Sequence, residues 1–118
     1  MMTKHLPHWC AYGIDREYRT AKAVQWHIGK KHSGWVLHIA PGREFESSVP
    51  WVLRWLIDPR DPRLLLAALI HDDLLESGHR RFFAAGEWYD AALKGGVSKW
   101  LALPAAVVLA ILVDKRVD

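Results

Sequence analysis

The sequence predicts an α+β protein in which a short antiparallel β-hairpin packs on three to four α-helices. Two runs within residues 22–42 alternate apolar and polar residues, which is the two-residue period of a strand. Apolar residues recur at helical spacing over much of residues 50–113. The length suits one domain, and no repeat, linker or low-complexity tract divides it. We therefore expect a single domain over residues 1–118.

The hairpin is predicted from two alternating runs joined by a polar stretch that glycines bound on both sides. The apolar members of the runs are Val24, Trp26 and Ile28, followed by Trp35, Leu37 and Ile39. If Ile28 pairs with Trp35, then Trp26 lies opposite Leu37. This register predicts that two indoles are buried on one face of the hairpin.

Capping residues and glycines mark the predicted helices. Asp61 followed by Pro62 indicates a helix start, because the carboxylate caps free amides and proline has no amide to leave unpaired. This helix should end near Glu76. Further helices are expected over residues 81–94, before a pair of glycines, and over residues 98–113.

An additional helix is expected to begin at Pro50, capped by Ser47 or Ser48. Trp51 and Trp55 lie one turn apart on it and would form a stacking platform for a base or a sugar. Ser48, Trp51 and Trp55 are therefore candidate binding residues. The same spacing of aromatic residues is also typical of a protein core.

Residues 100–113 form a run of fourteen apolar residues that contains Pro104. A helix that crosses a bilayer needs about 20 such residues, so we expect a buried helix and no membrane span. The start of the chain does not have the pattern of a signal peptide. Cys10 is the only cysteine in the sequence, so an intrachain disulfide is excluded and a reducing compartment is expected.

The net charge of +3 is unevenly distributed. Residues 1–45 carry seven Lys and Arg against three Asp and Glu, whereas residues 46–118 carry nine against ten. A basic portion of this kind would suit nucleic acid. An ordinary solvated surface has the same composition.

His71 and Asp72 are the main candidates for chemistry. Helical spacing places His71 over apolar residues, so its ring should point inward. A buried imidazole without a hydrogen-bond partner would cost about 1–3 kcal/mol. One interpretation is a core histidine whose hydrogen bond is satisfied. The other is a metal ligand or general base, with Asp72 as the second ligand.

Four blocks of the sequence carry a family resemblance. They are IAPG at 39–42, ESSVP at 46–50, AALIHDDLL at 67–75 and AALKGGV at 91–97. In this order and spacing the chain resembles a domain-of-unknown-function family of tailed phages and prophages, whose pattern reads roughly VPxGF, TDxASVP, AAxxHDxLY and ADxxFxxAL. The resemblance implies a phage or prophage origin and a location in the host cytoplasm or the virion. It implies no reaction.

The chain departs from the family pattern at its acidic positions. The aspartate of TDxASVP falls on Phe45 by direct count, or on Glu46 if one residue is deleted. The aspartate of ADxxF falls on Gly86, or on Glu87 after a shift of one residue, and the family's tyrosine is Leu75 here. Under the shifted alignments the candidate catalytic cluster consists of Glu46, His71, Asp72 and Glu87.

Three functions follow. The first is a phage accessory protein without catalysis or cofactor: a virion component, an assembly factor or a host-interaction module. Its partners would be other phage or host proteins, or a second copy of the chain. The second is a hydrolase in which His71 and Asp72, with Glu46 or Glu87, bind a divalent metal that activates water. The third is a nucleic-acid binder. The incomplete catalytic set favours the first.

Overall fold

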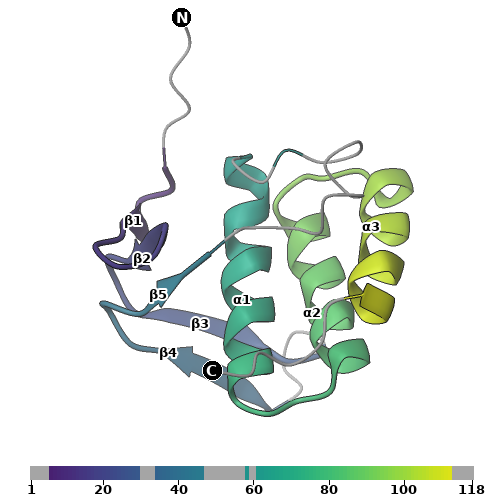
Figure 1. Cartoon of the computed structure of the whole chain (residues 1–118), viewed down its shortest axis with the longest axis horizontal. Helices are drawn as coiled ribbons and strands as arrows, with labels where there is room; N and C mark the ends of the chain where they lie inside the picture. The colour runs from purple at the N-terminus through teal and green to yellow at the C-terminus, as the bar shows by residue number, and fades with distance from the viewer. Residues whose placement is uncertain (1–5, 30–33, 47–57, 59–60, 113–118) are drawn as a thin grey trace, which may run out of the picture. The chain divides into compact units, whose positions relative to one another are not determined.

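The computed structural model describes residues 6–29, 34–46, 58 and 61–112. The chain divides into two compact units, residues 1–46 and residues 47–118. The first unit contains antiparallel strands and the second contains helices (Figure 1). The predicted α+β class is confirmed. The packing of the hairpin on the helices and the single domain stay predictions.

A three-stranded antiparallel sheet opens the first unit. Its strands are β1 (Cys10–Tyr12), β2 (Tyr18–Thr20) and β5 (Glu44–Phe45), in the order β1-β2-β5. The sequence does not predict this sheet. Each strand has only two or three residues, so no period is visible in the sequence, and pairs such as Tyr18 with Phe45 are distant along the chain.

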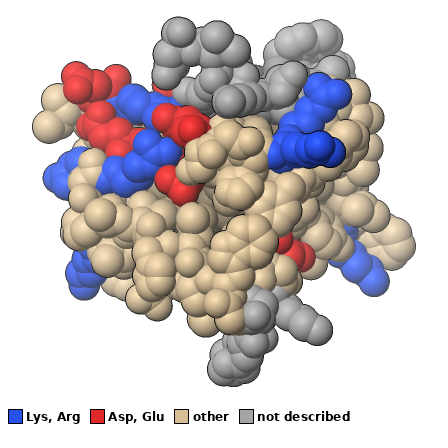
Figure 2. All heavy atoms as spheres, turned by 90° about the horizontal axis from the view of Figure 1, so that it is seen from below, with Lys and Arg blue, Asp and Glu red and all other residues tan. Residues whose placement is uncertain are grey.

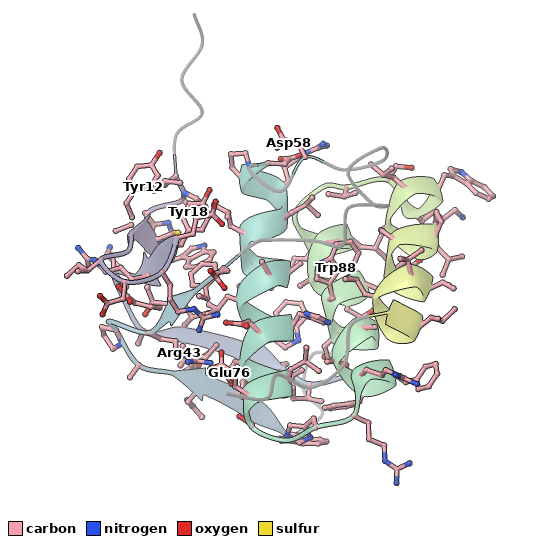
Figure 3. The ribbon with its side chains drawn as sticks, viewed as in Figure 1. Tyr12, Tyr18, Arg43, Asp58, Glu76 and Trp88 are labelled. Carbon is pink, nitrogen blue, oxygen red and sulfur yellow. The ribbon has the colours of Figure 1, made fainter. Side chains whose placement is uncertain are left out.

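Aromatic rings form the centre of this sheet. Phe45 is completely buried, and its ring centroid lies 6.0 Å from that of Trp9 and 5.7 Å from that of Tyr18. Tyr12 and Tyr18, on neighbouring strands, stack at 6.0 Å (Figure 3). The aromatic cluster therefore supplies the core that such short strands cannot supply through backbone pairing alone.

Glu44 joins β5 to the turn between β1 and β2. Its carboxylate accepts hydrogen bonds from the backbone amides of Ile14 at 2.6 Å and Asp15 at 3.2 Å. The bond from Ile14 is the main reason that the pKa of the Glu44 carboxyl is lowered. Gly13 is required in the same turn, because a Cβ there would collide with the carbonyl oxygen of Arg16.

The predicted hairpin is formed by β3 (Val24–His27) and β4 (Val36–Ile39). Trp26 pairs with Leu37 in the predicted register, and the amide of Ile28 donates to the carbonyl of Trp35 at 2.8 Å. The expectation of two buried indoles is wrong, because Trp26 is buried whereas Trp35 is 53% exposed. Trp35 lies just before β4, directly after Gly34 with its φ of 87°, so it is outside the regular face.

The helical unit begins with the 3₁₀ turn η2 (Pro62–Leu64), followed by α1 (Leu65–Glu76), α2 (Arg81–Lys94) and α3 (Lys99–Leu112). Asp61 caps the start as predicted, and its carboxylate accepts a hydrogen bond from the amide of Arg63 at 2.9 Å. The predicted limits of the first two α-helices are confirmed. The predicted helix from Pro50 lies outside the described residues.

Leucines and isoleucine of α1 and Trp88 of α2 form the core of the helical unit (Figure 3). α2 packs against both α1 and α3 (Figure 1). The buried side of α3 is built mainly from small residues: Ala102, Ala105, Ala106 and Ala110. Close packing also fixes the end of α2, because a Cβ at Gly95 would collide with the carbonyl oxygen of Arg63.

The expectation that α3 is buried is wrong for its outer side. Trp100 is 79% exposed, and three further apolar residues of the helix are about half exposed. Pro104 lies inside the helix, on the exposed side. The helix packs through one side against α2, and the other described elements leave its remaining apolar surface uncovered. Over the described ranges, no helix has both the length and the apolar character needed to cross a membrane.

Candidate functional site

Among the described residues of the helical unit, three polar side chains are buried. His71 and Asp72 on α1 are 9% and 3% exposed, and Glu87 on α2 is 5% exposed. The predicted inward orientation of His71 is confirmed. The Nε2 atom of this ring makes no hydrogen bond to the residues that the structure describes, although the side chain has other interactions.

Asp90 lies one helical turn after Glu87 on α2. Partial burial raises the pKa of the Asp90 carboxyl, and the nearby carboxylate of Glu87 raises it further. The charged form of Asp90 is therefore disfavoured by the folded protein.

Of the remaining predicted site residues, one belongs to the other unit and the rest lie outside the described residues. Glu46 belongs to the first unit, where its Oε1 atom lies 3.5 Å from Nη2 of Arg16. Ser48, Trp51 and Trp55 lie outside the described residues. Within the described ranges, no group of three or more His, Cys, Asp and Glu side chains is placed to hold a metal ion. The catalytic and metal roles stay predictions.

Opposite charges are interspersed on part of the surface. Arg16 pairs with Glu46, and in the view from below, blue and red side chains lie next to each other at the left (Figure 2). A nucleic-acid site requires cations gathered on one face. The face in Figure 2 shows no such single-sign stripe over the residues drawn in colour, and nucleic-acid binding stays a prediction.

A groove of about 300 Å³ runs along the seam between α2 and α3. Its lining residues are all uncharged: Phe82, Ala85, Gly86 and Tyr89 from α2, and Leu103, Ala106, Val107, Ala110 and Ile111 from α3. Residues three or four positions apart line it, which is the spacing of one face of a helix. The helices therefore present a joint apolar face.

Exposed apolar side chains gather around this groove. Nine large apolar side chains are exposed among the residues with a described position, and six of them lie on α2 and α3: Phe82, Leu93, Trp100, Leu103, Val107 and Ile111. Large exposed apolar patches in soluble proteins commonly mark interaction sites. We refer to the groove and these six side chains as the α2/α3 surface.

Gly86 lines the groove near the middle of α2. Glycine inside a helix costs about 0.5–1 kcal/mol relative to alanine. A Cβ at Gly86 would have no described atom within 4 Å, so packing within the described part of the chain does not require glycine here. Its lack of a side chain keeps the groove open.

Cations lie at both ends of the α2/α3 surface. The guanidinium carbon of Arg81 lies 5.8 Å from the ring centroid of Phe82, and Nζ of Lys99 lies 5.3 Å from the ring of Trp100. The two helices run in opposite directions, so their starts lie at opposite ends of the groove (Figure 1). Neither helix has an acidic residue in its first turn. Basic side chains therefore flank the apolar middle of the surface at both ends.

The sequence contained a signal for this surface. The run at 100–113 has no charged residue, and a helix that is apolar all round must be covered on all sides to be buried. The predicted burial of this run requires neighbours on every side of the helix, whereas α2 is its main neighbour among the described elements. The sequence of α2 gives a weaker indication of an exposed apolar surface, because charged residues lie between its apolar residues.

Comparison of the chain with protein-family models, with curated proteins and with solved structures finds no match. The resemblance to the phage family therefore stays a prediction. The α2/α3 surface is the feature from which a function can be argued.

Proposed function

We propose that the protein is a non-catalytic binding module that recognises another protein through the α2/α3 surface. The observation that carries this proposal is an uncharged groove whose lining includes four of the six exposed large apolar side chains of α2 and α3. Removing such surface from water favours association by roughly 25 cal/mol per Å². Aromatic residues and arginine, here Phe82, Tyr89, Trp100 and Arg81, are also the types enriched at interface centres.

The biological setting is part of the same proposal. A phage or prophage accessory protein, whether a virion component, an assembly factor or a host-interaction module, needs a recognition surface and no catalytic residues. The phage setting depends on the sequence resemblance alone, and the binding role depends on the α2/α3 surface. Either part can therefore fail without the other.

Site-specific photocrosslinking tests the binding role. A photoreactive amino acid is placed at Val107 of the full chain, in the cells that naturally carry the gene. Ile14 provides the matched control, because it is also an exposed apolar residue, 87% exposed, and lies in the other unit. We expect the photoreactive residue at position 107 to form a covalent adduct with a single partner protein that is not this chain. The residue at position 14 should form no adduct of that mass.

A second substitution tests whether the adduct depends on the surface. Leu103 is 52% exposed, so Leu103→Glu should leave the melting temperature nearly unchanged. The same change should abolish the adduct, because it places a charge beside the apolar groove. An adduct that survives Leu103→Glu, or a Val107 sample that gives no adduct beyond the Ile14 control, would contradict the binding role.

A further inference from the structure

Resting on the proposed function, we infer that the partner of the α2/α3 surface is an amphipathic helix of about three turns that belongs to a different protein and carries Asp or Glu at both ends. Four features of the surface lead to this assignment: its chemistry, its length, its charge and its central glycine.

The chemistry of the lining selects a helix over an extended peptide. The nine lining residues offer no charged group, and the hydroxyl of Tyr89 is their only polar side-chain atom. An extended peptide would leave backbone amides and carbonyls without partners there, which is costly. A helix satisfies its backbone hydrogen bonds internally and can place an apolar stripe in the groove.

The length of the surface sets the length of the partner. Trp100 and Ile111 mark its extent along α3, eleven residues apart (111 − 100). At 1.5 Å per residue this extent is about 16 Å, which a helix of about 11 residues, or three turns, would cover. Apolar residues of the partner should therefore recur at i, i+3, i+4, i+7 and i+11.

The charge of the surface selects acidic ends. Arg81 lies at one end of the groove and Lys99 at the other. Neither α2 nor α3 has an acidic residue in its first turn. The half-buried Asp90 is the one carboxylate of this helix pair that is not fully buried. Carboxylates at both ends of a partner helix would complement this pattern.

The same charges argue against a second copy of the chain. Two copies that meet through the α2/α3 surface would bring basic side chains of one copy near basic side chains of the other. An antiparallel arrangement would bring Lys99 of one copy toward Arg81 of the other, and a parallel one would bring like residues together. Like charges brought together across an interface disfavour association. A different, acidic chain avoids this repulsion.

Gly86 supports close approach of a partner helix. Its missing side chain leaves space near the middle of the groove, and the surrounding chain gains no packing from that space. A glycine that weakens its own helix is explained if a partner backbone comes near at this position. Filling the space should therefore block binding while the helix becomes more stable.

Two synthetic peptides test the inference with the full chain. Both have 16 residues, capped ends and the same leucines at the predicted spacing. One has two glutamates at each end and the other has two lysines. By isothermal titration calorimetry in 50 mM NaCl, we expect the Glu-ended peptide to bind at least about tenfold more tightly, with a smaller difference in 500 mM NaCl because salt screens exposed charges.

Variants of the full chain locate the binding. Gly86→Leu and Val107→Glu should each weaken the Glu-ended peptide at least about tenfold, and Ile14→Glu should change its affinity less than about twofold. Equal affinity of the two peptides, tighter binding of the Lys-ended peptide or no binding of either would overturn the inference. A retained crosslink from Val107 would show that the proposed function survives that failure.

Two further measurements test whether the α2/α3 surface binds a second copy of the chain or a lipid surface instead. Sedimentation equilibrium of the full chain should show a monomer, and a dimer that Val107→Glu dissociates would assign the surface to a second copy. Vesicles of phosphatidylcholine and phosphatidylserine should not co-sediment with the protein. Co-sedimentation that Val107→Glu abolishes would assign the surface to lipid. Either result would overturn the acidic-helix assignment.

Discussion

The two units of the chain are stabilised in different ways. In the first unit, short strands depend on a few specific contacts: the buried hydroxyl of Thr20 donates to the carbonyl of Ala40 at 2.8 Å and accepts from the amide of Arg43 at 2.9 Å. In the helical unit, stability comes from hydrogen bonds within each helix and from a core of leucine, isoleucine and alanine. Each of these many residues contributes a small part of it. Single changes in the first unit should therefore have larger effects.

Phe45→Ala should give the largest effect, a loss of about 3–5 kcal/mol in the free energy of unfolding. Phe45 is completely buried between Trp9 and Tyr18 and connects β5 to the rest of the sheet. Urea denaturation followed by fluorescence measures the change. Tyr12→Ala is the control, since Tyr12 is 65% exposed and should cost less than about 1 kcal/mol. Similar losses for both variants would show that the buried ring of Phe45 is not a specific contact on which the short strands depend.

His71→Ala should cost about 2 kcal/mol, because it removes a buried ring from the helical core. His38 is exposed, so His38→Ala should be nearly neutral. Thermal unfolding of both variants, with and without excess zinc, separates the two interpretations of His71. Unchanged stability of His71→Ala, together with a zinc-dependent rise in the melting temperature that only the wild-type protein shows, would favour an open metal site instead.

Gly95→Ala should lower the free energy of unfolding by about 1–2 kcal/mol, because the new Cβ would collide with the carbonyl of Arg63. Gly86→Ala is the matched substitution in the same helix. It should instead raise stability by about 0.5–1 kcal/mol, since alanine is the better helix former and no described atom is in its way. Equal signs for the two changes would show that the close contact at Gly95 does not constrain the helical unit.

Asp90→Asn should give the smallest effect, a stabilisation below about 1 kcal/mol at pH 7. Burial and Glu87 raise the pKa of Asp90 in the folded state above its ordinary value of 3.8, so ionised Asp90 destabilises the fold. The advantage of the asparagine variant should shrink as the pH falls through the raised pKa and vanish below about 3.8. Urea denaturation at pH 7, 5 and 3.5 measures it. An advantage that grows toward acid would contradict the sign.

The sequence was informative where structure is local. Helix limits at Asp61, Glu76 and Gly95 follow from capping chemistry and from glycines within a few residues. The hairpin register also follows from a local pattern. The sheet β1-β2-β5 could not be predicted, because Tyr18 and Phe45 meet across a long stretch of chain and neither lies in an alternating run. The inward orientation of the His71 side chain was predictable from the apolar residues at helical spacing around it. The uncharged run at 100–113 was a signal for the exposed face of α3, but it did not determine that face, because exposure depends on how many elements pack around a helix.

The alanines on the buried side of α3 have a geometric consequence. Small side chains at a helix contact let the two axes approach toward the short end of the usual 8–10 Å range. Most of the buried positions of α3 are alanines with Leu109 among them, whereas Trp100 and the branched side chains of Leu103, Val107 and Ile111 are exposed. Mutations that enlarge Ala106 or Ala110 would push α2 and α3 apart. The α2/α3 surface would then lose its shape before the helical unit lost its fold.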